Sequence, residues 1–112
     1  MSITFQTNNP SALLAAFKKG IHDGHIVTWM HDKGTDMFTH TPPQWRGKAW
    51  LSPVIEVGQL RFKFFGAKGV TWEEYGVYHG RFIEAMIVHC RDLFVNGSAT
   101  SKPSADDFIA AA

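Results

Sequence analysis

The sequence contains one cysteine, Cys90, among 112 residues. An intramolecular disulfide therefore cannot form, which excludes the small secreted domains that depend on disulfides. No apolar run approaches the roughly 18 residues that suggest a membrane-spanning helix. The first residues also lack the basic start and apolar run of a secretory signal. From these absences we expect a soluble cytoplasmic protein that does not use a membrane.

Net charge is also small, because 11 Lys and Arg residues nearly balance 10 Asp and Glu residues and leave a net charge of +1. Such a balance predicts no strong long-range attraction to nucleic acid or to an anionic membrane. Hydrophobic residues make up 45% of the chain and aromatic residues 13%, which is enough for a packed core. At this length one domain is expected.

The first half of the chain predicts a strand, a helix and a pair of strands. Residues 3–7 alternate between apolar and polar, which is typical of a short strand, and we place it at a sheet edge. Asn9 and Pro10 form a helix start, and apolar residues at helical spacing continue the helix to about residue 22. Residues 25–32 and 37–41 are rich in strand formers on either side of a turn.

The clearest local pattern is a β-hairpin, in which residues 49–57 and 60–67 flank Gly58-Gln59. In the predicted register Ile55 faces Phe62, and Glu56 faces the opposite charge of Arg61. The face expected to cover the core carries six apolar side chains: Leu51, Ile55, Val57, Leu60, Phe62 and Phe64.

A second helix is predicted over residues 72–95. Thr71 and Glu74 form a capping box at its start, and Asn96-Gly97 ends it. Its predicted buried stripe consists of Trp72, Tyr75, His79, Phe82, Ile83, Met86, Cys90, Leu93 and Phe94. Residues 98–112 are rich in Ser and Ala and are expected to form a flexible or weakly helical tail, so that the folded domain spans residues 1–97.

The element order β-α-β-β-β-β-α predicts an α+β fold with two layers. We expect an antiparallel sheet of about four to five strands, connected as hairpins in a meander, with both helices on one face.

Histidine is plentiful, with six residues, but the sequence contains no metal-binding motif. His22 and His25 are three residues apart, yet the first helix is expected to end between them. No Cys-x-x-Cys or His-Glu-x-x-His pattern is present. We therefore assign no metal and no cofactor, and interpret these histidines as surface residues near turns.

His79 lies at the centre of the apolar stripe of the second helix. Two interpretations are open: a core histidine bonded to a tyrosine or a backbone carbonyl, or a general base at the floor of a pocket. In the second case Tyr75, one turn earlier, and Arg81 would assist it. Because no nucleophile or acid is evident beside them, these three residues are weak candidates, and the sequence does not decide whether the protein is an enzyme.

Gly76 and Gly80 are unexpected inside a helix, where each costs about 1 kcal/mol relative to alanine. They predict either close packing against the first helix or room for a ligand or a second subunit. Val77 and Val88 point together to the outward side, among charged residues. This pattern indicates a self-interaction surface.

The second face of the hairpin combines Trp50 and Phe65 with Arg61 and Lys63, and Trp45 is expected nearby. Aromatic and basic side chains together suit single-stranded nucleic acid, by base stacking and phosphate contacts. They also suit a protein partner or a second copy of the chain. We favour the protein interface.

Three functional hypotheses result. The first is a non-enzymatic binding or regulatory module that forms a homodimer or other homo-oligomer, or binds a protein partner. The second is a small ligand-binding protein or enzyme with a pocket around His79. The third is single-stranded nucleic-acid binding through the open sheet face, which is possible but not favoured.

Overall fold

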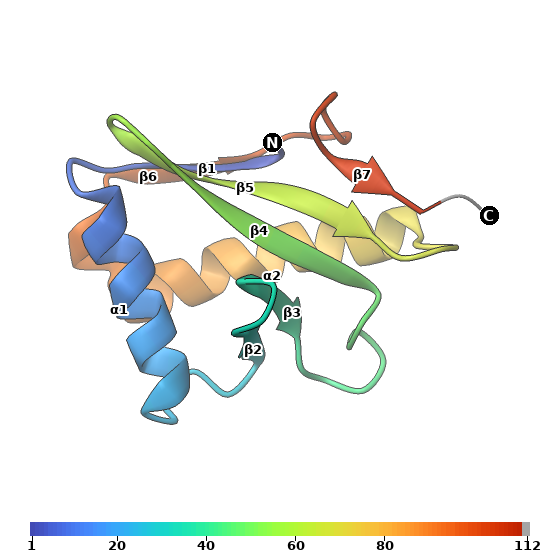
Figure 1. The fold of residues 1–112 in the computed structure, drawn as a ribbon, viewed down its shortest axis with the longest axis horizontal. Coiled ribbons are helices and arrows are strands. Elements are labelled where there is room, and N and C mark those ends of the chain that lie inside the picture. Colours follow the sequence, from blue (N-terminus) through green and yellow to red (C-terminus); the bar gives the residue numbers. More distant parts are fainter. Residues whose placement is uncertain (111–112) are drawn as a thin grey trace.

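A computed structural model describes residues 1–110 of the chain, and Figure 1 shows its fold. The elements in chain order are β1 (Ile3–Gln6), α1 (Pro10–His22), β2 (Trp29–Asp32), β3 (Met37–His40), β4 (Ala49–Glu56), β5 (Gln59–Gly66), α2 (Trp72–Cys90), the 3-10 turn η1 (Arg91–Leu93), β6 (Asn96–Ala99) and β7 (Phe108–Ile109).

The strands form one sheet in the order β2-β3-β4-β5-β1-β6, with all neighbours antiparallel. The short strand β7 pairs with β5 in parallel. Helix α2 crosses behind β4 and β5 in Figure 1, with α1 beside it. The predicted α+β fold is confirmed, as is the predicted element order through α2. The sheet has more strands than expected because β6 and β7 follow α2.

Local sequence signals set the starts of both helices. The Asn9 side chain accepts a hydrogen bond from the Ala12 backbone amide, and Pro10 occupies the first turn of α1. The capping box of α2 is complete, because Thr71 accepts from the Glu74 amide and Glu74 accepts from the Thr71 amide. Helix α2 ends at Cys90 rather than at the predicted residue 95.

The β4–β5 hairpin is present, but its register differs from the prediction. Glu56 pairs with Gln59 and Ile55 with Leu60, so Val57 and Gly58 are the two central turn residues. Gly58 has a φ of 80°, a conformation that glycine adopts without a steric penalty. The shift moves every partner by two residues, so each side chain stays on its predicted face. Ile55 and Val57 were nevertheless wrongly assigned to the core, because both side chains are exposed at the end of the hairpin.

Strand β1 was wrongly predicted at a sheet edge, because it lies between β5 and β6. The segment 96–110, expected to be a tail from residue 98 onward, pairs with the sheet at two places. Its residues 96–99 pair with β1 and its residues 108–109 pair with β5. Residues 98–110 contain no helix, and a turn precedes β7. Residues 111–112 of the predicted tail lie outside the described residues.

The core lies between the sheet and the two helices. Phe82 of α2 is at its centre, with ring centroids 4.7 Å from Phe62, 4.9 Å from Trp29 and 5.1 Å from Phe17. The mutual angles of 62° to 79° are those of edge-to-face aromatic packing. This packing fixes which side of α2 is buried and which side is left to solvent.

Helix α2 shows that the predicted stripe was placed slightly wrong. Tyr78, outside that stripe, is fully buried, whereas Trp72 is 68% exposed. Leu93, predicted in the stripe as well, is also exposed. Trp72 is the first residue of α2, and its indole contacts the Tyr75 ring edge-on while most of its surface stays in solvent. Within residues 1–110 neither helix is long and apolar enough to cross a membrane.

Candidate functional site

Gly76 and Gly80 face open space on the solvent side of α2. A Cβ atom added at either glycine would meet no neighbouring atom within 4 Å. Gly20 of α1 is different, because a Cβ atom there would lie 2.7 Å from Cδ1 of the buried Ile26. The interpretation of Gly76 and Gly80 as a close helix contact is therefore wrong. The open space at both glycines is compatible with the alternative interpretation, which is room for a ligand or a second subunit.

A cavity of about 720 Å³ lies beside these glycines. One wall is α2, and the other is the segment that leaves β6. The lining residues are Trp72, Tyr75, Gly76, His79, Gly80, Ala99, Thr100, Ser101 and Lys102. We call this cavity the α2 groove. It brings together four residues singled out from the sequence: Tyr75, Gly76, His79 and Gly80.

A closed circuit of hydrogen bonds joins the two walls of the α2 groove. The Tyr75 hydroxyl donates to the Thr100 carbonyl at 3.0 Å, and the Thr100 amide donates to the Ser2 carbonyl at 2.9 Å. The Ser2 hydroxyl lies 2.7 Å from Nε2 of His79, and Nδ1 of His79 lies 2.6 Å from the Tyr75 carbonyl. The groove is therefore bound to the fold by four consecutive contacts rather than by packing alone.

The contacts of His79 fix its tautomer. A carbonyl can only accept, so Nδ1 carries the proton and donates to Tyr75. In the neutral ring Nε2 then accepts from the Ser2 hydroxyl. Burial lowers the pKa of His79 below its ordinary value, against an opposing effect of the Tyr75 carbonyl. His79 is thus a neutral imidazole with both nitrogens occupied, stacked on the Tyr75 ring at 3.9 Å.

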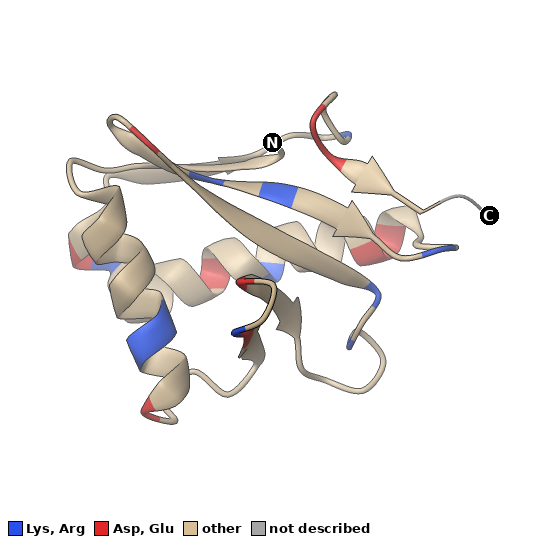
Figure 2. Ribbon diagram, viewed as in Figure 1, with Lys and Arg blue, Asp and Glu red and all other residues tan. Residues whose placement is uncertain are grey.

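Arg81 does not line the α2 groove with His79. It lies on the other side of the two glycines and lines a second hollow, of about 450 Å³, with Val77 and Glu84. Its guanidinium bonds both carboxylate oxygens of Glu84, at 3.1 and 3.2 Å. Figure 2 shows the alternation of acidic and basic positions along α2. Val77 is half-buried beside Arg81, and Val88, also on the outward side, is exposed.

Two parts of the α2 groove were missed in the sequence. Trp72 was assigned to the buried stripe, although its place as the first residue of the helix was a signal that it could project past the core. Thr100, Ser101 and Lys102 belong to the segment expected to be a tail, and nothing in their local sequence indicates a wall. Their position depends on β6 pairing with β1, which joins residues far apart in the chain.

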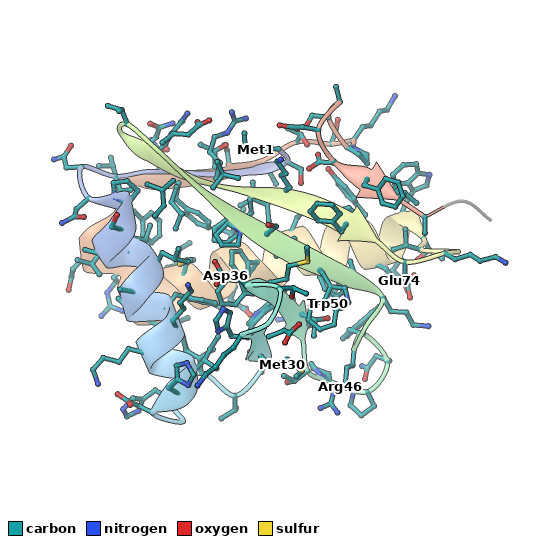
Figure 3. The ribbon with its side chains drawn as sticks, viewed as in Figure 1. Met1, Met30, Asp36, Arg46, Trp50 and Glu74 are labelled. Carbon is teal, nitrogen blue, oxygen red and sulfur yellow. The ribbon has the colours of Figure 1, made fainter. Side chains whose placement is uncertain are left out.

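The outer face of β4 and β5 carries most of the second predicted site. Trp50 pairs with Phe65 across the two strands, and Lys63 and Arg61 lie on the same face. Figure 3 labels Trp50 on this hairpin. Arg61 is engaged, because its Nε donates to Thr4 at 3.1 Å and its Nη1 lies 3.7 Å from Glu56.

Trp45 is not part of that face. It packs against the core from the β3–β4 loop, and its carbonyl accepts from the buried Tyr78 hydroxyl. Nucleic-acid binding on the outer face stays a prediction.

Comparisons with protein-family models, with curated proteins and with solved structures give no match.

Two of the remaining titratable groups contact one carboxylate. His31 and Lys18 both contact the Asp36 carboxylate, at 2.7 and 2.8 Å. Within residues 1–110 no group of three or more His, Cys, Asp or Glu residues could hold a metal ion. Cys90 is buried, and burial raises the pKa of its thiol, which keeps it protonated.

Proposed function

We propose that this protein is a non-enzymatic binding module and that the α2 groove holds its ligand. The ligand class that fits is a small molecule with a flat apolar body and one negative charge. The observation that supports this proposal is the pair of helix-interior glycines, which face open space beside the largest of the cavities considered above.

The groove lining favours a ligand with an apolar body. Trp72 presents an exposed indole at one end, and Tyr75 contributes a ring stacked on His79. The two rings contact each other edge-on at 5.8 Å, and beside them Gly76 and Gly80 leave the helix backbone bare, so that a flat ring can approach it closely. A volume of about 720 Å³ is in the range of small-molecule sites, about 300–1,000 Å³.

The opposite wall of the groove favours a ligand with a negative charge. Lys102 is the one charged side chain among the nine lining residues, because His79 is neutral. The hydroxyl of Ser101 lies in the same wall. An anionic group at this end of the groove gains a cationic partner and a hydrogen-bond donor.

The hydrogen bonds of His79 favour a role in binding rather than catalysis. A general base needs a free nitrogen within reach of the substrate, but Ser2 occupies Nε2 and the Tyr75 carbonyl occupies Nδ1. Ser2 is 1% exposed, so its hydroxyl does not reach a ligand as a nucleophile. We infer that His79 positions the groove walls and does not react.

The test uses 8-anilinonaphthalene-1-sulfonate, a flat apolar anion whose fluorescence rises in apolar surroundings. We expect saturable binding to the native protein. Gly76→Leu should abolish it, because Gly76 lines the groove and a Cβ atom there meets no neighbour within 4 Å, so the longer side chain takes up groove volume. Ala15→Leu is the matched control, since it adds leucine at an exposed position of α1, away from the groove.

A second variant tests the charge. Lys102→Glu should weaken sulfonate binding at least about tenfold, because attraction at the groove is replaced by repulsion. The proposal fails if native protein does not bind the probe. It also fails if Gly76→Leu binds as well as Ala15→Leu, while circular dichroism shows both variants folded.

A further inference from the structure

A smaller cavity, of about 250 Å³, lies between α2 and the segments that flank the β2–β3 pair (Figure 1). Thr28 and His40 line one side of it, Arg81 and Glu84 of α2 line another, and the β3–β4 loop lines the rest. We call this cavity the His40 hollow. It shares no lining residue with the α2 groove, so the two sites can be filled independently.

His40 has one ring nitrogen fixed by the fold. The residue is 4% exposed, so its interpretation as a surface histidine is wrong, and its ring stacks on Trp29 with the centroids 4.6 Å apart. Nδ1 lies 2.6 Å from the Thr28 carbonyl, which can only accept, so Nδ1 carries the proton and donates. Burial lowers the pKa of His40, and in the neutral ring Nε2 holds a lone pair.

Nε2 of His40 opens into the hollow without a partner. No group of residues 1–110 forms a hydrogen bond with it. The buried side-chain polar atoms that lack a partner in this part of the chain belong to Trp29 and His31, so Nε2 of His40 still contacts solvent. At His79 the corresponding nitrogen is occupied by the Ser2 hydroxyl. The fold therefore holds a rigid acceptor at His40 and leaves it free.

Arg81 and Glu84 add one positive and one negative group to the hollow. Nη1 of Arg81 bonds both carboxylate oxygens of Glu84, at 3.1 and 3.2 Å. Nε and Nη2 have no partner within the described residues 1–110, and together they form a fork that can donate two parallel hydrogen bonds to a carboxylate. Each oxygen of Glu84 can also accept a further hydrogen bond.

We propose that the His40 hollow binds a small zwitterion of the α-amino-acid class. The ammonium group donates to Nε2 of His40 and to Glu84, and the carboxylate accepts from Nε and Nη2 of Arg81. A ligand with only a negative charge would be repelled by Glu84, and one with only a positive charge by Arg81, so the pair favours a ligand with both charges. The volume of about 250 Å³ lies below the usual range of drug-sized sites, about 300–1,000 Å³, and suits the smallest amino acids.

The test is a titration of the full chain with glycine, followed in ¹H–¹⁵N correlation spectra that resolve the ring nitrogens of histidine. The Nε2 signal of His40 should shift and saturate at millimolar glycine, whereas that of His79 should stay in place. Sodium acetate and methylammonium chloride each supply one of the two charges and should bind at least about tenfold more weakly. Sodium chloride at the same ionic strength controls for screening.

Variants on α2 test the two charges. Arg81→Gln and Glu84→Gln should each weaken glycine binding at least about tenfold. Glu73→Gln is the matched control, because Glu73 is on the same helix but does not line the hollow. His40→Asn keeps an N–H group for the Thr28 carbonyl and removes Nε2, so it should abolish binding. Arg81 and Glu84 have side chains that are 59% exposed, so their variants carry the test if His40→Asn does not fold.

The outcomes also separate this proposal from the one for the α2 groove. Glycine that leaves the Nε2 signal of His40 unshifted overturns the zwitterion site, and so does acetate or methylammonium that binds as well as glycine. Equal binding by Glu84→Gln and Glu73→Gln, with both folded by circular dichroism, overturns it as well. Gly76→Leu should bind glycine like the native chain, because Gly76 does not line the hollow. Glycine should not displace the sulfonate probe, whose binding tests the α2 groove alone.

Discussion

Replacing Gly76 and Gly80 by alanine tests whether these residues serve the fold or the surface. Each lies in the interior of α2, and an added methyl group meets nothing within 4 Å. Alanine loses less backbone freedom than glycine when a helix forms, so each substitution should stabilise the monomer by about 0.5–1 kcal/mol.

The expected total is about 1–2 kcal/mol for the double variant, because no atom has to move to accept the new methyl groups. This corresponds to a rise in Tm of roughly 5–10 °C for a domain near this size. The assay is urea unfolding followed by circular dichroism, at a protein concentration low enough that the chain is monomeric. The linear dependence on urea then gives the free energy of unfolding for each variant.

Gly20→Ala is the matched control. The same change in helix propensity applies in α1, but the new Cβ atom would lie 2.7 Å from Cδ1 and 3.1 Å from Cγ1 of Ile26. Ile26 is buried and would have to shift, which offsets the gain. A loss of stability in Gly76→Ala or Gly80→Ala would refute our reasoning, because the glycines would then have a structural role that the open space does not reveal.

Three further predictions concern single side-chain contacts. Thr71→Ala removes the cap that Glu74 completes and should lower the free energy of unfolding by about 1 kcal/mol, measured by urea titration. The buried N–H of Phe64 donates to the Asp107 carboxylate at 2.7 Å. Asp107→Ala should lower the free energy of unfolding by about 1–3 kcal/mol and speed amide hydrogen exchange at Phe64. Unchanged exchange at Phe64 would contradict this contact. Burial lowers the pKa of His79 below its ordinary value of 6.5. Below pH 6.5 the unfolded chain therefore binds more protons than the folded chain does. The free energy of unfolding should consequently fall as the pH drops below 6.5. His79→Gln should flatten the decline, leaving the part due to His40, whose pKa burial also lowers; an equally steep decline would argue against a neutral buried His79.

The residues that sequence reasoning placed correctly act mainly on their near neighbours in the chain. Asn9 caps α1, and Thr71 with Glu74 caps α2, because the bonds they make are to amides only three residues away. His79 was expected to be buried from its place in the helical stripe, and it is. Whether its partner would be a carbonyl was left open, and the contact with Tyr75 is again within one helical turn.

The errors have a common physical origin. Ile55 and Val57 have the same apolar character as Phe62, but they lie past the edge of the helical layer and are exposed. The hairpin register changed by two residues because Gly58, with its positive φ, takes the second central position of the turn. Apolar pattern alone records which side of a strand a residue is on, not how far the opposing layer extends.

The α+β class, both helix starts, the hairpin and the two faces of its strands follow from the sequence alone, because they depend on local bonds and on periodicity. The exposure of Trp72, the open space at Gly76 and Gly80 and the wall formed by residues 100–102 become visible only in the folded chain. Those facts depend on where α2 ends relative to the sheet and on β6 pairing with β1. Such contacts join distant parts of the chain, and no local pattern contains them.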